Sequence, residues 1–371
     1  MTDHNNYSLR KCLQMATCEN IFHKILNDLE LNPLFSEIKT CISNYINFPE
    51  KPLQQKDSEA ESWLKWARNR QHLKIISAEI PEGILPDNSP GHLLDVRVFT
   101  HRGPDDDIYD NNKDIRDKVA RGNCFLSIHS GENRRTRCVI YALKKFTGGL
   151  GDDDDRTSGD DFTWKKYFNK PLDAASSIVA TRKANGEAAH LSCLKIDDQY
   201  IICAGSKNVH LLFKNKEDVT KYVEPRYKIA REVSETVWEA LEDMGEEKKN
   251  RLLEFLCVTD YTAIFEILHP DHQHVEEFTH LKKPLLQFIT WCSNDLVPTE
   301  SSSLCSMPPH ISIEIARYLG LSTVQYDIIG VSDVDPRMSQ IRQGYGYEGE
   351  VLYFLDSENN VIGLLKKKTI W

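Results

Sequence analysis

The 371-residue chain has 40% hydrophobic and 27% charged residues, which excludes a disordered or fibrous protein. Its net charge of -10 at pH 7 argues against coating nucleic acid by overall charge, but leaves room for a local basic groove. The chain starts without an apolar signal segment and has no run of about 18 apolar residues. We therefore expect a soluble protein without a membrane partner, cytoplasmic, with the nucleus as the alternative location.

The first part of the chain predicts helices. Within residues 1–48, Ile21, Ile25 and Leu29 recur at helical spacing. A polar segment at 49–62 follows and is typical of a linker or an exposed loop. We predict a helical N-terminal lobe over residues 1–90 and a second domain over residues 91–371. The role of the lobe is unknown, and binding of a protein partner is one possibility.

Strands and helices alternate through the rest of the chain. The runs HLSCLKI and YIICAGS flank Asp197-Asp198, which predicts a hairpin. A helix is predicted over 226–256 with a break near Gly245, and a short one over 311–321. Further strands are expected within the segments 92–103, 119–131, 261–268 and 323–333.

Cysteine and histidine residues raise the question of a metal site. The ten cysteines are scattered without a CxxC pair, which favours reduced thiols. The segment 269–280 holds His269, His272, His274 and His280, a spacing that zinc can use. No glutamate-centred catalytic motif or nearby cysteine accompanies them, so zinc stays the less favoured interpretation.

The C-terminal segment predicts a second hairpin, because two β-rich runs bracket residues 357–360. A turn centred on residue 357 would place Glu348 opposite Lys366. Lys366 and Lys368 would then share one face and Lys367 the other. The alternative is a charged sheet edge without a chemical role.

Lys183 lies in TRKANGEAA, between a run of small residues and a predicted strand. A lysine is nucleophilic only as a neutral amine, which requires desolvation or cationic neighbours. If Lys183 shared a cleft with Glu266 and the hairpin, Lys366 and Lys368 would lower its pKa and neutralise a nucleotide α-phosphate. Glu348 could then hold Mg²⁺, and the amine would attack and expel pyrophosphate.

These pieces resemble, in content and order, the ATP-dependent RNA ligases of phage type and of fungal and plant tRNA splicing, which are covalent nucleotidyltransferases. KANG at 183–186 is similar to their KxDG or KxNG motif, and the resemblance covers about residues 115–371. The other matching motifs are ARG at 120–122, KYFN at 166–169, GSKN at 205–208, FEILHPDHQHV at 265–275, EGEV at 348–351 and KKKT at 366–369.

The resemblance implies an α+β fold with a mainly antiparallel-sheet, ATP-grasp-like nucleotidyltransferase domain at 91–371. It implies that Lys183 carries AMP, that Glu348 binds Mg²⁺ or Mn²⁺, and that RNA ends are the partners. The residues expected to bind ATP are Arg121, Lys166, Phe168, Asn185, Gly186, Lys207, Glu266, Lys366 and Lys368.

The implied reaction is lysine adenylylation, transfer of AMP to an RNA 5′-phosphate, and sealing by a 3′-hydroxyl, as in RNA repair or tRNA splicing. Transfer of AMP to another acceptor, use of GTP, and a non-catalytic RNA-end-binding protein remain alternatives. Two departures stand out: Tyr167 replaces the first phenylalanine of KFFN, and the chain ends at Trp371 without the C-terminal domain that many RNA ligases carry.

Overall fold

The computed structural model confirms an α+β protein with mainly antiparallel sheets. It describes residues 20–47, 51–100, 103–130, 133–149, 152, 162–271, 275–297 and 303–370. The strands form a first sheet in the order β1-β2-β3-β4, a central sheet β11-β10-β9-β6-β7-β8, and a third sheet β12-β5-β13-β14. Only the β10–β11 pair is parallel among the strand pairs of the described residues.

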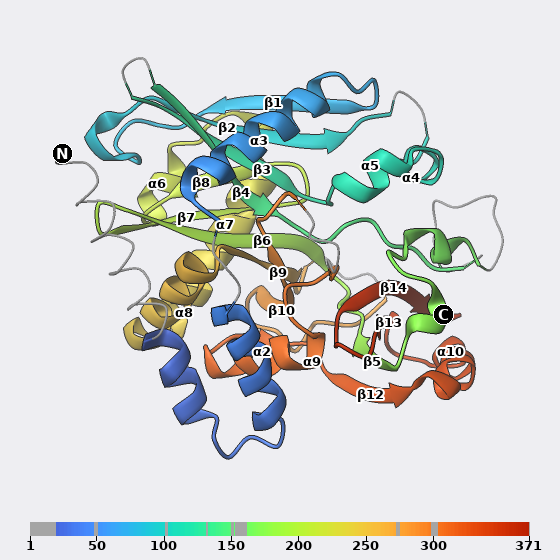
Figure 1. Ribbon diagram of the computed structural model, residues 1–371. Coiled ribbons are helices and arrows are strands. Elements are labelled where there is room, and N and C mark those ends of the chain that lie inside the picture. Colours follow the sequence, from blue (N-terminus) through green and yellow to red (C-terminus); the bar gives the residue numbers. More distant parts are fainter. Residues whose placement is uncertain are drawn as a thin grey trace.

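The first sheet lies at the top of Figure 1, with α3 (Leu53–Arg68) across it. Trp63 on the buried face of α3 packs against Phe125 with ring centroids 5.0 Å apart. The strands of this sheet are β1 (Leu73–Glu79), β2 (Gly91–Val98), β3 (Asn123–Ser130) and β4 (Asn133–Tyr141), and the short helices α4 (Asp106–Asn111) and α5 (Lys113–Lys118) connect β2 to β3.

The first 90 residues are not wholly helical, which corrects the expected helical lobe. β1 lies within them and pairs along its whole length with β2, on the other side of the expected boundary. Residues 20–28 and α2 (Phe35–Asn47) instead lie beside α8 and α9, at the opposite end of the molecule from the first sheet (Figure 1). Phe22 contacts Phe255, with ring centroids 6.1 Å apart. The division into two domains at residue 90 stays a prediction.

The central sheet confirms several predicted elements. Its β6–β7 turn consists of Asp197 and Asp198, both with positive φ, as a two-residue hairpin turn requires. Gly245, at φ +80°, separates the two long helices that cover this sheet. The strands are β6 (Glu187–Ile196), β7 (Gln199–Gly205), β8 (His210–Phe213), β9 (Tyr261–Leu268), β10 (Leu285–Ser293) and β11 (Ser322–Thr323); the helices are α6 (Lys216–Thr220), α7 (Lys228–Asp243), α8 (Glu246–Thr259) and α9 (Pro309–Tyr318).

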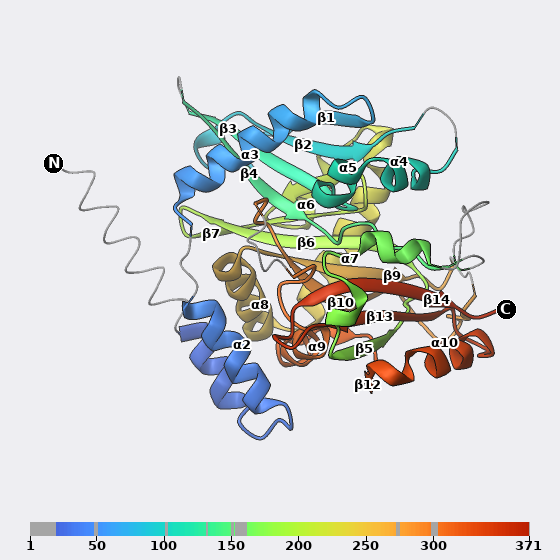
Figure 2. The ribbon, with the colours of Figure 1, turned by 45° about the vertical axis from the view of Figure 1, so that its right-hand side comes forward.

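The third sheet packs one face against the central sheet. Val179 and Tyr353 on that face are buried together with Ile264 of β9. The opposite face is covered by α10 (Val334–Arg342), seen beside β12 and β5 in Figure 2. The strands of this sheet are β5 (Ser177–Arg182), β12 (Tyr326–Gly330), β13 (Gly349–Leu355) and β14 (Val361–Lys368).

The C-terminal hairpin exists, but its predicted register is wrong. Lys366 lies opposite Val351, and the backbone N–H of Thr369 donates to the carbonyl of Glu348. The hairpin is therefore offset by three residues from a turn centred on residue 357. The cause is a longer loop at 356–360, organised by Asp356, together with a register shift next to Leu355.

Two further observations concern the chain as a whole. The eight cysteines in the part of the chain that the structure describes are free thiols, six of them buried. None of the helices formed by the described residues combines the length and the apolar character that crossing a membrane requires.

Candidate active site

Lys183 lies where β5 ends and the chain turns toward β6. Its backbone N–H still donates to the carbonyl of Gly349, 2.9 Å away, so the turn is anchored to β13. Its Nζ donates to Glu348 Oε2 at 2.6 Å and to the carbonyl of Ala184 at 3.3 Å. A short ion pair thus joins two residues that lie 165 positions apart.

Asn185 fixes the same carboxylate from a second side. Its Nδ2 donates to Glu348 Oε2 at 3.0 Å, while its Oδ1 accepts the backbone N–H groups of Val275 and Glu276 at 2.8 and 3.0 Å. An asparagine can donate and accept at once, whereas an ionised aspartate would place a second negative charge against Glu348. The asparagine form of the motif therefore suits this chain.

Gly186 brings the backbone against β9. Its N–H donates to Glu266 Oε2 at 2.7 Å. A Cβ at this position would lie 2.2 Å from the carbonyl oxygen of Ile267, so no larger residue fits without moving the strand. Burial, together with the nearby Glu348, raises the pKa of Glu266 to about 7, against the opposing effects of Lys183 and the Gly186 N–H.

Glu348 is the centre of the cluster. Burial alone would raise its pKa, but Lys183, Asn185 and Lys368 together hold it below the usual value. Lys368 Nζ lies 3.4 Å from Oε1, the oxygen that Lys183 does not use. The nearest charged partner of the Lys183 amine is thus a carboxylate, and the lysine of the hairpin lies on the far side of it.

The donor set suits a hard divalent cation. Mg²⁺ is commonly held by one or two carboxylates together with substrate phosphates. A carboxylate offers about four lone-pair directions, and the three nitrogen donors on Glu348 leave room for one more partner. Glu348 therefore fits Mg²⁺ or Mn²⁺ as a partner shared with a bound nucleotide.

Arg121 and Lys207 meet in a second cluster, around Asp105. Arg121 Nη1 lies 2.6 Å and Lys207 Nζ 3.1 Å from Asp105 Oδ2. Lys145 approaches Oδ1 at 3.7 Å and Asp106 at 2.8 Å. Burial would raise the pKa of Asp105, but the three cations hold it well below its usual range. Sequence reasoning missed Lys145 and both aspartates, since no motif marks them.

The sheet topology places both clusters at one end of the central sheet. β6 begins just after Gly186, and its antiparallel neighbour β7 ends just before Ser206. On the other side of β6, Ala188 pairs with Glu266 of β9. The turns that carry Lys183 and Lys207 therefore leave the sheet at the same end.

The KYFN residues lie elsewhere. Phe168 packs on Phe354 with ring centroids 5.1 Å apart, and a Cβ on Gly363 would lie 2.3 Å from its ring. Phe354 is five residues from Gly349 along β13, or about 17 Å at the usual rise of a strand. The structure therefore places Phe168 in a hydrophobic cluster outside the Lys183 site, and Lys166 beside it is exposed.

Tyr167 accounts for the departure from KFFN. Its ring is buried, and its hydroxyl donates to Asp110 Oδ1 at 2.5 Å, a bond that phenylalanine cannot make. The bond joins this turn to α4, next to the Asp105 cluster.

The histidines proposed as an alternative zinc site are only partly described. His269 contacts Asp271, and His272 and His274 lie outside the described residues. The group of described residues whose donor atoms lie close enough to share a metal is instead Asp95, Cys124 and His210.

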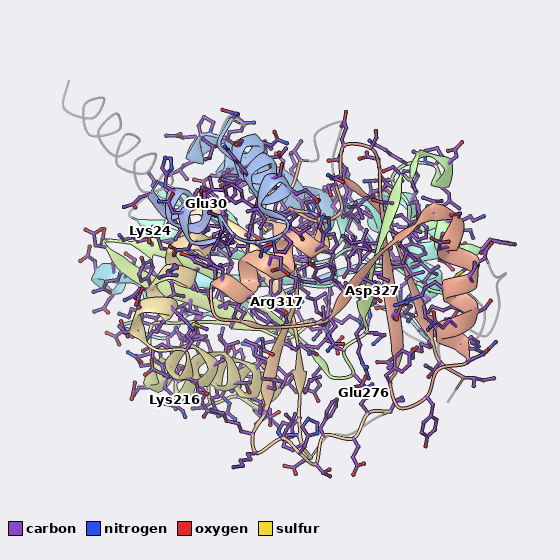
Figure 3. All side chains as sticks on the ribbon, turned by 90° about the horizontal axis from the view of Figure 1, so that it is seen from below. Lys24, Glu30, Lys216, Glu276, Arg317 and Asp327 are labelled. Atoms are coloured by element: carbon purple, nitrogen blue, oxygen red, sulfur yellow. The ribbon has the colours of Figure 1, made fainter. Side chains whose placement is uncertain are left out.

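A cavity of about 520 Å³ lies on the outer face of the third sheet, away from the Lys183 amine. Arg182, Arg317 and Arg337 line it, but Asp327 and Glu350 line it too, and Arg337 pairs with both. Figure 3 shows Arg317 on α9 and Asp327 on β12 on this side of the molecule. The mixed charge argues against a strong anion site.

Comparison with known proteins gives a family. Residues 93–369 match the model described as "Domain of unknown function (DUF7920)". The chain belongs to this family. The match begins within β2 and includes every residue of the two clusters. No curated protein matches the chain.

Some solved structures are remotely similar to this chain. An archaeal ATP-dependent RNA ligase is similar over 86% of this chain and 65% of its own, with 13% identity and a TM-score of 0.43. A Naegleria gruberi RNA ligase with PPi is similar over 81% of this chain and 97% of its own, with 10% identity and a TM-score of 0.36. At these values, what the site does has to be inferred from its own residues.

Proposed function

We propose that the protein is a covalent nucleotidyltransferase that uses Lys183 to form a lysine–AMP bond and passes the AMP to an RNA 5′-phosphate, as an ATP-dependent RNA ligase does. One observation carries the proposal: Lys183, Asn185 and Lys368 converge on Glu348, while Gly186 is bound to Glu266. These residues come from four separate motifs of the RNA ligase pattern.

The chemistry follows from the contacts. The Lys183 nitrogen forms a bond to the α-phosphorus of ATP, the bond from that phosphorus to the bridging oxygen breaks, and pyrophosphate leaves with the electron pair. Attack needs the free amine, so the ammonium first gives a proton to water, and Glu348 Oε2, 2.6 Å from the nitrogen, orients the amine. Lys368 would stabilise negative charge on the phosphate.

Substrate binding is assigned to the neighbouring groups. Glu266, with a pKa of about 7, can accept or donate a hydrogen bond near neutral pH and would face the ribose hydroxyls. Arg121, Lys145 and Lys207 would meet the outer phosphates. Mg²⁺ or Mn²⁺ held by Glu348 would supply charge neutralisation at the reacting phosphate.

The RNA step is the finer part of the proposal, and its support is the order of the motifs rather than a described RNA contact. In the second reaction an RNA 5′-phosphate oxygen attacks the same phosphorus, and the Lys183–phosphorus bond breaks. In the third a 3′-hydroxyl attacks the activated 5′-phosphate and AMP leaves. Repair and splicing of RNA are the pathways in which such an activity would serve.

The test is labelling with α-³²P-ATP and Mg²⁺. The wild type should acquire an acid-labile AMP label, while Lys183→Ala should not; Lys195→Ala, on an exposed strand end, is the matched control. Label on Lys183→Ala would disprove the nucleophile. A 5′-phosphorylated RNA should remove the label and be converted to joined product. If it does neither, the AMP has a different acceptor.

A further inference from the structure

Three titratable side chains form a buried chain between β2, β8 and β6 that the proposed chemistry does not use. Asp95 Oδ1 lies 2.6 Å from His210 Nδ1, and His210 Nε2 lies 3.1 Å from His190 Nδ1. All three residues are at most 4% exposed. A buried carboxylate and two buried imidazoles are costly unless their hydrogen bonds are complete.

The far end of the chain fixes where the protons lie. The ring of His190 hydrogen-bonds the backbone of Ser206. The Ser206 N–H already donates to the carbonyl of Val209 at 3.0 Å, so the ring must donate to the Ser206 carbonyl. Because burial and the adjacent His210 lower the pKa of His190, the ring is neutral, and Nδ1, the nitrogen that faces His210, is the acceptor.

At the near end, one proton is shared between His210 and Asp95. His210 has to donate from Nε2 to His190, and its Nδ1 faces Asp95, which also accepts the His210 backbone N–H at 3.2 Å. Asp95 Oδ1 and His210 Nδ1 therefore share one proton, carried either by the ring beside a carboxylate or by Asp95 beside a neutral ring, and either arrangement completes the hydrogen bonds.

The two rings hold the turns of the second cluster. A Cβ on Gly122 would lie 2.3 Å from His190 Cε1, and a Cβ on Gly205 would lie 2.9 Å from His210 Cδ2. Each glycine lies within two residues of a cation, Arg121 and Lys207 respectively. Both cations reach the same oxygen of Asp105, so a shift in either turn would separate them.

We propose that His190 is a positioning residue, locked by His210 and Asp95, that fixes Arg121 and Lys207 relative to each other and so sets the affinity of the site for the phosphates of a nucleotide. This role rests on the proposed function, because the proposed function supplies the nucleotide. It adds residues that touch no substrate and that none of the matched motifs contains.

A metal centre is the competing interpretation, and the distances disfavour it. Donor atoms of Asp95, Cys124 and His210 lie within 4.8 Å of one another. Two ligand atoms about 2.0 Å from a tetrahedral zinc ion stand about 3.3 Å apart. The separation of 2.6 Å between His210 Nδ1 and Asp95 Oδ1 is that of a hydrogen bond instead.

Nucleotide affinity tests the positioning role. In the full chain, His190→Gln should weaken ATP binding about tenfold, the lower end of what partners behind ligating groups contribute, and leave the labelling rate at saturating ATP within about threefold. His92→Gln, on the same strand as Asp95 but not in the buried chain, is the control and should change neither. Unchanged affinity in a folded His190→Gln protein would overturn the proposal.

The wild type provides a test that no folding defect can obscure. Its ¹⁵N-histidine spectra should show a proton on His210 Nε2 and none on His190 Nδ1; a proton on His190 Nδ1 would overturn the proposal. The proposal would also be overturned if the wild type bound one zinc ion per chain and Cys124→Ser lost it. ATP binding without a Lys183 adduct, still weakened by His190→Gln, would leave the positioning role standing while the proposed function fails. No ATP binding by the wild type would remove both.

Discussion

The clusters around Glu348 and Asp105 share one construction and differ in what surrounds it. In each, a carboxylate is held ionised by cations from distant parts of the chain. Glu348, however, has the raised-pKa group Glu266 as a neighbour and the Lys183 amine as its closest partner. In the described part of the chain, the charged partners of Asp105 are Arg121, Lys145 and Lys207, and Lys145 also pairs with Asp106. The difference supports the proposal that the first cluster carries the chemistry and the second binds the nucleotide.

Replacing the central carboxylate of each cluster tests whether the two clusters have different roles. Glu348→Gln keeps the shape but removes the charge that holds Lys183 and Lys368. The rate of AMP labelling at saturating ATP should fall about 100-fold, the usual effect of deleting one electrostatic group from an active site. Single-turnover labelling measures it, with Glu350→Gln on the opposite face as the control. Equal rates for both variants would contradict the catalytic assignment.

Asp105→Asn should act on stability first. The variant leaves Arg121 and Lys207 beside Lys145 without the carboxylate that they share, which should cost about 2 kcal/mol of unfolding free energy after allowance for the partial exposure of Arg121 and Lys207. The folded pKa of Asp105 is depressed, so its stabilisation is present above the unfolded pKa and is lost as pH falls through the folded value.

Urea unfolding at pH 7 and pH 3 measures the Asp105 effect. The difference between wild type and Asp105→Asn should shrink at the lower pH. Asp114→Asn, whose partner Arg70 is well exposed, is the control and should change stability by less than about 0.5 kcal/mol. A loss that is the same at both pH values would show that charge is not the cause.

Glu266 should have the opposite pH dependence. Its folded pKa is raised from 4.5 to about 7, so its protonated form favours folding and that contribution is lost as pH rises between these values. Glu266→Gln should therefore be more stable than the wild type at pH 8, by about 1.5 kcal/mol since the residue is half-buried as judged by its exposed surface, and similar below pH 4.5. Melting temperatures across this range provide the measurement; a constant difference would contradict the burial effect.

The same comparison shows how far the sequence can lead. KANG and EGEV contain residues that the structure brings together, Lys183 and Asn185 on Glu348, because the proposed chemistry restricts the residue type at each position. The partners of Arg121 and Lys207 could not be predicted, since Asp105 belongs to an acidic loop that is typical of solvated surface. The predicted register of the C-terminal hairpin was also wrong, because the register depends on how Asp356 closes the loop.

Secondary structure shows a similar division. The alternating runs of β6, β7 and β9 and the helical stripe of α7 were predictable from periodicity. β1, β4 and β10 were not, because charged or polar residues interrupt their apolar positions and their partners lie in other parts of the chain. Pairing across a sheet can override weak local preference.

Phe168 gives the smallest and most discriminating prediction. The motif resemblance assigns it to ATP, whereas the structure packs its ring on Phe354 and against Gly363. Phe168→Leu should therefore cost about 1 kcal/mol of unfolding free energy, as a partly refilled cavity does, and leave the affinity for ATP unchanged. Phe162→Leu, on an exposed side chain of the same segment, should change neither. Weaker ATP binding by Phe168→Leu at unchanged stability would return this residue to the nucleotide site and would mean that the hairpin moves when ATP binds.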